Sequence, residues 1–257
     1  MLDAALKEGV SLSVDDRGVA YLTFAHPRSN SLPGAVLSEL AATVRELGLR
    51  SDVKVVVLGS AGDRAFCAGA SFDELVAISD EEAGLAFFMG FAHVINALRS
   101  IPQLVIGRVQ GKAVGGGVGV AAATDYCLAT QHAAIKLSEL AVGIGPFVVG
   151  PAVERKLGVS AMSQLSIDAS AWRSSEWACS RGRYTEVLDD IAALDAAVDA
   201  LAGRLASSNP EAMSALKQVF WSGTEAWDTL LAERAAISGR LVLSDFTRDA
   251  IQRFKAK

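Results

Sequence analysis

The stretch GKAVGGGVGVAAATD, residues 111–125, carries four glycines within five positions: Gly115, Gly116, Gly117 and Gly119. Glycine loses more conformational freedom on folding than any other residue. Such a run is therefore expected where side chains would prevent another group from approaching the backbone. A glycine turn that opens a short helix leaves backbone N–H groups unpaired at the positive end of the helix dipole. These donors suit an oxygen on which negative charge develops, as in an oxyanion hole.

A second turn offers the partner donor that such a site needs. In RAFCAGASFDEL, residues 64–75, the turn Ala68-Gly69-Ala70 leads into a segment that begins with Ser71. Ser71 and Glu74 have the spacing of a capping box, which predicts a helix start with unpaired N–H groups nearby. Alone, this stretch would be an ordinary capped surface helix; together, the two turns predict a pair of backbone donors.

The glycine run also has three other possible interpretations. A phosphate-binding P-loop is excluded because Gly111-Lys112 is followed by Ala113 rather than Ser or Thr. A dinucleotide fingerprint fits residues 117–122, with Glu139 as the ribose-binding acid, but the β-like run at 125–130 leaves too short a crossover helix. Close packing of a short helix against a sheet remains open.

Glu139 is an acidic residue within an apolar stretch of the sequence. It stands in KLSELAVGIG among Leu137, Leu140 and Val142. An apolar pocket of this kind would raise the pKa of the carboxyl into the range useful for proton transfer. The alternative is a solvent-facing glutamate in a turn.

Strands and helices that alternate along the chain must position the backbone donors and Glu139. Strands are expected at 19–24, 54–59, 104–109, 125–130 and 134–137, and helices at 33–48 and 85–100. From about residue 148 the pattern is almost wholly helical. We therefore expect an α/β core over residues 1–205 and a helical region over 206–257.

Composition excludes several classes of protein. The chain has 257 residues, a net charge of −5 and no long basic run, so nucleic-acid binding is not expected. The start resembles no signal peptide, and the longest uncharged apolar run, 140–153, is too short and too rich in proline to span a membrane. Three scattered cysteines indicate reduced thiols in a cytoplasmic protein, and no His, Cys or Asp cluster has metal-ligand spacing.

Together, the two turns carry a resemblance to a known family. AFCAGASFDEL and GRVQGKAVGGGVGVAAATDYCLAT resemble the two signature segments of the enoyl-CoA hydratase/isomerase family, the crotonase superfamily. HPRSNSL, residues 26–32, is similar to an early segment of that family, and the order, spacing and length also agree. AIKLSELAVGIGPFVV resembles a bacterial subgroup described as hydratases of branched or dienoyl-CoA substrates.

The resemblance implies a fold, a ligand and an assembly. The fold would be a crotonase-like spiral of ββα turns followed by helices that build a homotrimer or a hexamer. The ligand would be an acyl-CoA thioester, with coenzyme A as part of the substrate and no separate cofactor. The thioester oxygen would lie between the N–H groups of Ala70 and Gly116, in a site lined by Ala68, Gly115, Gly117 and Gly119. Arg28 and Lys255 are candidates for contact with the CoA phosphates.

The sequence departs from the family pattern at one carboxylate. Hydratases of this family use two glutamates; the second matches Glu139, but the first falls on Gly119. Reversible hydration with Glu139 as acid and base is the first expectation, because of the subgroup resemblance. A double-bond isomerase using Glu139 alone is the alternative, since one base can remove and return a proton. A non-catalytic acyl-CoA-binding protein is the alternative of another class.

Overall fold

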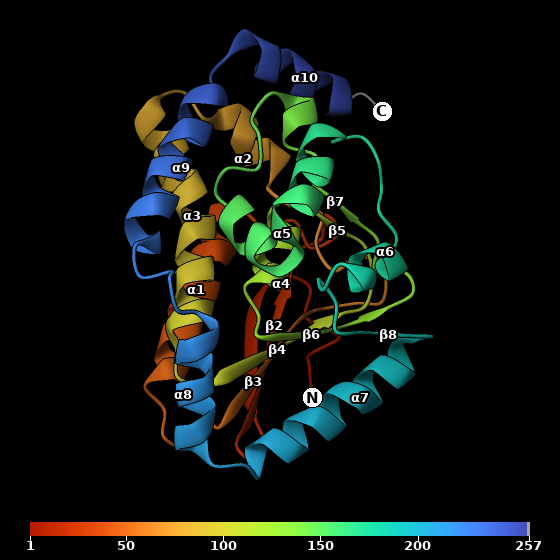
Figure 1. The fold of residues 1–257 in the computed structure, drawn as a ribbon. Helices are drawn as coiled ribbons and strands as arrows, with labels where there is room; N and C mark the ends of the chain where they lie inside the picture. The colour runs from red at the N-terminus through yellow and green to blue at the C-terminus, as the bar shows by residue number, and fades with distance from the viewer. Residues whose placement is uncertain (256–257) are drawn as a thin grey trace.

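The computed structural model describes residues 1–255 and is built around a six-stranded sheet (Figure 1). The strand order is β1-β2-β3-β4-β6-β8. Only β1 runs antiparallel to its neighbour, and the other pairs are parallel. The bounds are β1 Gly9–Val14, β2 Val19–Ala25, β3 Val55–Ser60, β4 Leu104–Val109, β6 Tyr126–Thr130 and β8 Glu186–Leu188. A separate parallel pair joins β5 (Ala113–Val114) to β7 (Ile135–Lys136).

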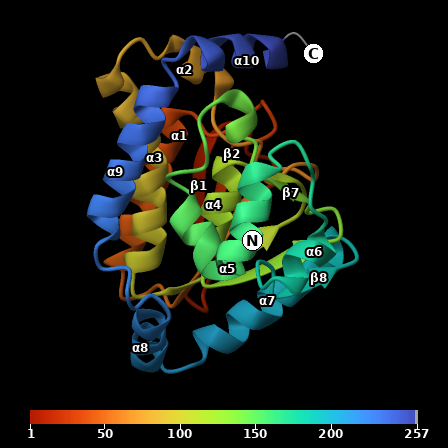
Figure 2. The ribbon, with the colours of Figure 1, turned by 45° about the horizontal axis from the view of Figure 1, so that its top comes forward.

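Helices cover both faces of the large sheet. They are α1 Gly34–Gly48, α2 Phe72–Ala77, α3 Glu81–Ser100, α4 Gly116–Ala122, α5 Gly150–Ile167, α6 Ser175–Ser180, α7 Ile191–Ala206, α8 Pro210–Phe220, α9 Trp227–Leu241 and α10 Asp245–Lys255, with a 3-10 turn, η1, at Leu140–Val142. Figures 1 and 2 both show α1, α3 and α9 side by side, with α7 on the other side of the sheet.

Alternation along the strands divides the core in two. Leu22 and Phe24 of β2 point into the main core with α1 and α3, whereas Val19 and Tyr21 point towards α7. Successive side chains of a strand face opposite sides of a sheet, so a strand covered on both sides is apolar throughout. This explains the continuous apolar run of β2, which is buried along its whole length.

Most of the expected elements are present. The strands expected at 19–24, 54–59, 104–109, 125–130 and 134–137 correspond to β2, β3, β4, β6 and β7, and the two expected helices to α1 and α3. After residue 148 the described chain is almost wholly helical, as expected, but it also contains the strand β8, which pairs with β6 and was not expected. β8 has only three residues, too few to show a strand period, and tertiary pairing decides it.

The C-terminal helices pack on the core of the same chain. Lys217 of α8 is 2% exposed and lies 3.0 Å from the Asp125 carboxylate. Its Nζ also donates to the carbonyl oxygens of Leu98 and Gln103, at 2.7 and 2.8 Å. Trp221 Nε1 donates to the other Asp125 oxygen at 2.6 Å. The chain passes from α7 to α8 near the expected boundary, but α8 and α9 share one hydrophobic core with the preceding residues. The assembly role of residues 206–257 stays a prediction.

Candidate active site

Backbone hydrogen bonds hold the two turns side by side. The N–H groups of Phe66 and Cys67 donate to the Lys112 carbonyl oxygen, at 3.0 and 3.2 Å, and Val114 N–H donates to Cys67 O at 2.9 Å. The segments therefore run parallel, as the bridge between Cys67 and Ala113 also records. This register brings the Ala68-Gly69-Ala70 turn against the start of α4.

Both backbone donors expected for an oxyanion hole are unpaired. Within residues 1–255, the N–H groups of Ala70 and Gly116 donate no hydrogen bond. Gly116 is the first residue of α4, so its N–H has no carbonyl four residues back within the helix. Ala70 follows Gly69, whose φ of +92° turns the chain. Both residues line the same cavity.

Position 115 requires glycine for two reasons: its backbone conformation and the closeness of Glu139. Its φ of +51° and ψ of −118° are conformations that residues with a Cβ rarely adopt. A Cβ built there would lie 3.0 Å from Glu139 Oε1. A side chain at Gly115 would therefore push the carboxylate out of place.

The other three glycines make room for the side chains of the protein itself. A Cβ on Gly116 would lie 2.1 Å from the Phe91 ring, and one on Gly117 would lie 2.5 Å from Cys67 Cβ. A Cβ on Gly119 would lie 2.4 Å from Val149 Cβ. Close helix packing, one of the interpretations left open above, thus accounts for these three positions. Gly117 and Gly119 stand behind the wall of the cavity, so the expectation that they line it needs correction; Ala68 and Gly115 do line it.

Glu139 is held by the small parallel pair. Gly115 N–H donates to Lys136 O at 2.8 Å, which fixes the end of β7 beside the glycine turn, and Glu139 follows three residues later. The Glu139 carbonyl oxygen accepts from Val142 and Ile144 N–H, closing the turn around η1. The carboxylate is thereby directed back towards Gly115.

The Glu139 carboxyl lies in an apolar environment. Its Oε2 is buried and has no hydrogen-bond partner among the described residues. Burial disfavours the charged form and outweighs a backbone hydrogen bond within Glu139, so that it raises the pKa of Glu139 from 4.5 to about 7. A carboxyl with this pKa can both accept and return a proton near neutral pH.

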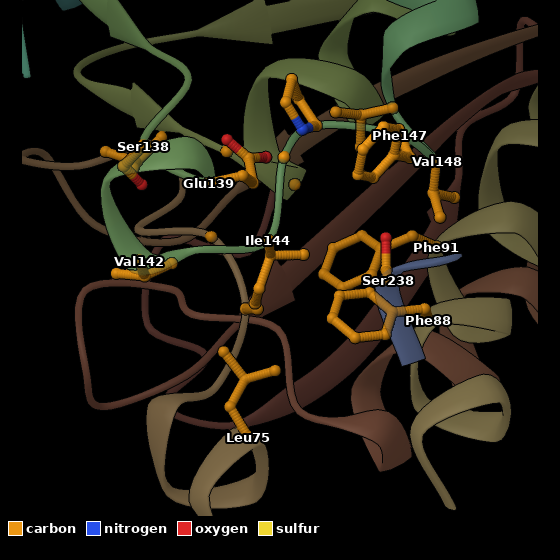
Figure 3. Close-up of a pocket in the computed structure, with 18 of the residues that line it drawn as sticks. Leu75, Phe88, Phe91, Ser138, Glu139, Val142, Ile144, Phe147, Val148 and Ser238 are labelled. Atoms are coloured by element: carbon orange, nitrogen blue, oxygen red, sulfur yellow. The ribbon is translucent and has the colours of Figure 1, made fainter. Parts of the chain in front are cut away.

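The cavity between the two turns is mainly apolar. Figure 3 shows Glu139 and Ser138 on one side of it, and Phe88, Phe91 and Ser238 on the other. Among the described residues that line this cavity, Glu139 is the only carboxylate. The one other charged side chain, Lys136, has its Nζ 4.6 Å from the centre of the Trp172 ring.

Ser71, Glu74 and Arg28 do not line the cavity. Ser71 caps α2 as expected, its Oγ accepting from Glu74 N–H at 3.4 Å. The Glu74 carboxylate does not close the capping box; it accepts from Gly34 N–H at 2.8 Å. Arg28 is 67% exposed and forms an ion pair with Asp73. The Lys255 side chain lies outside the described part of the structure.

Three residues of the site carried no signal of their own in the sequence. Phe91 and Val149 contact the glycines, and Ser238 comes from α9, far along the chain. Each has the residue type of an ordinary helix or loop position. The tight glycine spacing indicated close neighbours, but only the tertiary structure identifies which side chains they are.

Comparison with known proteins identifies the family. The model of a family described as enoyl-CoA hydratase/isomerase matches residues 15–255, which include both turns and Glu139. The chain belongs to the enoyl-CoA hydratase/isomerase family. It is therefore an enzyme of the crotonase type, and the crotonase fold expected from the sequence is confirmed.

Individual relatives of this family member cover nearly the whole chain. A probable enoyl-CoA hydratase of Bacillus subtilis is 26% identical over 250 residues, 96% of each chain. A short-chain-enoyl-CoA hydratase of Clostridium acetobutylicum is 28% identical, over 93% of this chain and 92% of the relative. The crystal structure of a putative enoyl-CoA hydratase from Mycobacterium avium paratuberculosis has a TM-score of 0.84 at 26% identity, over 96% of each chain. The crystal structure of an enoyl-CoA hydratase from Bacillus halodurans is 17% identical in sequence and shares the fold, with a TM-score of 0.87. The match covers 95% of this chain and 99% of that one.

Two kinds of feature are absent from residues 1–255. None of the helices there combines the length and the hydrophobicity needed to cross a membrane. Nor do three or more His, Cys, Asp or Glu side chains of that range gather where they would hold a metal ion.

Proposed function

We propose that this member of the enoyl-CoA hydratase/isomerase family stabilises the enolate of an unsaturated acyl-CoA thioester. The thioester oxygen accepts hydrogen bonds from Ala70 N–H and Gly116 N–H, and Glu139 moves the proton. The observation that carries the proposal is that two amides and one buried carboxylate oxygen, Glu139 Oε2, line a single apolar cavity and have no hydrogen-bond partner among the described residues. Removing one donor from such a site costs about 3–4 kcal/mol of transition-state stabilisation.

Between the two reactions expected from the sequence, the packing at Gly119 supports double-bond isomerisation. The first glutamate of the family pattern would stand at position 119, where Val149 occupies the space that its Cβ would need. Hydration must hold a water, add its oxygen to the β-carbon and protonate the α-carbon, and two carboxylates usually share this work. A proton shift needs one base: Glu139 removes a proton from the α-carbon, the charge moves to the thioester oxygen, and the proton returns at the γ-carbon.

Reversible hydration is the second candidate, and the names of the relatives favour it. The Clostridium acetobutylicum relative is a short-chain-enoyl-CoA hydratase, and its similarity extends over 92% of its length. In this reaction Glu139 would serve the water and the carbon in turn.

One experiment separates the candidates. The protein is incubated with pairs of α,β- and β,γ-unsaturated acyl-CoAs, and the products are identified by mass and by chromatography. Unchanged mass with a displaced double bond indicates isomerisation, and a gain of one water indicates hydration. Binding without either product, and without exchange of solvent deuterium into the acyl chain, would contradict both and leave a non-catalytic acyl-CoA-binding protein.

A further inference from the structure

Ser238 places a hydroxyl group in the apolar part of the active-site cavity. It belongs to α9, is 1% exposed and lines the cavity. Figure 3 shows it beside Phe88 and Phe91, on the opposite side of the cavity from Glu139. The proton transfer proposed above makes no use of it.

Close contact between two helices brings Ser238 to this position. A Cβ on Gly84 of α3 would lie 2.6 Å from the carbonyl oxygen of Gly239 in α9. A Cβ on Gly239 would lie 2.7 Å from the backbone nitrogen of Leu85. The two helices therefore touch through their backbones, and Ser238, next to Gly239, is carried into the cavity wall.

The Ser238 hydroxyl has no partner among the described residues. Other hydroxyls on helices of this chain donate to the carbonyl oxygen four residues earlier, as Ser166 does to Met162 at 2.8 Å and Thr43 to Glu39 at 2.9 Å. Ser238 makes no such bond within residues 1–255. A hydroxyl that faces the cavity and makes no hydrogen bond to the protein can pair with a polar group of a ligand bound there.

We infer that Ser238 recognises a neutral oxygen, a hydroxyl or an oxo group, on the acyl chain of the substrate. The inference rests on the proposed function, since it assumes that the cavity takes an acyl chain. A serine hydroxyl can donate and accept, so it pairs with either group. A carboxylate is excluded because the lining side chains near Ser238 are apolar, and Lys136 directs its ammonium to Trp172. The substrates are therefore oxygenated acyl-CoA thioesters rather than plain hydrocarbon ones.

Binding of saturated acyl-CoAs tests the inference without requiring turnover. A ladder of chain lengths is prepared in matched pairs, with and without a hydroxyl or oxo group at the last or the penultimate carbon, and each dissociation constant is measured by calorimetry. In the unaltered protein, one oxygenated compound should bind about 5- to 10-fold more tightly than its plain partner. Ser238→Ala, which keeps a small side chain at the helix contact, should remove this preference while leaving the plain compounds bound as before. Ser166→Ala removes a hydroxyl on α5 that is hydrogen-bonded within the protein, and this variant should keep the preference for the oxygenated compound.

Two results would overturn the inference. One is the absence of any preference for oxygenated chains in the unaltered protein across the whole ladder. The other is a preference that Ser238→Ala leaves intact, which would make the serine a small residue at a helix contact and nothing more. Turnover of plain unsaturated acyl-CoAs is measured in parallel. Turnover without preference contradicts only this inference, and preference without turnover contradicts only the proposed reaction.

Discussion

Replacement of Glu139 by glutamine should stabilise the protein and stop its turnover. In the folded protein Oε2 of the carboxyl is buried with no hydrogen-bond partner among the described residues, and burial raises the pKa of Glu139 from 4.5 to about 7. The folded state thus holds the proton more tightly than the unfolded chain. The stability contributed by the protonated group is fully present below about pH 4.5 and is lost as the pH rises through about 7.

The size of the change in unfolding free energy follows from the raised pKa of Glu139. A change in pKa from 4.5 to about 7 corresponds to about 3 kcal/mol of unfolding free energy across the full pH range. Between about pH 5 and about pH 8 the change is about 2–3 kcal/mol, because part of the loss occurs below pH 5. Glutamine has nearly the same shape and no charge, so Glu139→Gln should become the more stable protein as the pH rises.

Urea denaturation of both proteins at the two pH values, at one fixed protomer concentration, measures this difference. Glu46→Gln, which removes an exposed carboxyl on α1, is the matched control and should follow the unaltered protein. Turnover by Glu139→Gln should fall at least about 100-fold, the lower range for general acid–base catalysis. The reasoning is refuted if Glu139→Gln and the unaltered protein lose the same stability between the two pH values.

Three further substitutions test the donors, the glycine packing and the buried ion pair. Ala70→Pro deletes a backbone N–H and should lower turnover by at least about 100-fold with an unchanged circular dichroism spectrum; unchanged turnover would remove Ala70 from the site. Gly119→Ala should destabilise the protein by about 1–3 kcal/mol in urea denaturation because its Cβ meets Val149, and Val149→Ala in the same chain should recover part of the loss; no loss in the single variant would contradict the packing. Lys217→Met leaves Asp125 buried without its cation and should cost about 3–5 kcal/mol in the same assay, whereas a loss below about 1 kcal/mol would show that the pair is dispensable.

The sequence predicted most of the sheet because its strands are apolar runs between turns. The runs at 54–59 and 104–109 are apolar apart from Lys54 and Arg108, which is typical of strands covered on both sides. β8 could not be predicted in this way, since three residues show no period and its pairing with β6 depends on a distant part of the chain.

For the candidate site, the two turns predicted a pair of backbone donors, and the resemblance to the family selected Ala70, Gly116 and Glu139. The structure places these three residues around one cavity. The role given to Gly117 and Gly119 was wrong, because glycine leaves the same signal in the sequence whether a ligand or a neighbouring side chain occupies the space. Cys67 and Val149 occupy it here.

By itself, then, the sequence determined the fold class, the family and the residues able to supply donors and a proton. The α/β class follows from the pattern of apolar runs and turns. The family and the site residues follow from the resemblance of short segments to those of the family, and such segments can be recognised without knowledge of the tertiary structure. Only the tertiary structure decided that Val149 fills the place beside Gly119, that Glu139 Oε2 is buried with no partner among the described residues, and that Ser238 of α9 reaches the cavity. Each of these depends on contacts between segments distant in the chain, and the strength of an electrostatic or hydrogen-bonding group depends on how completely such contacts exclude water.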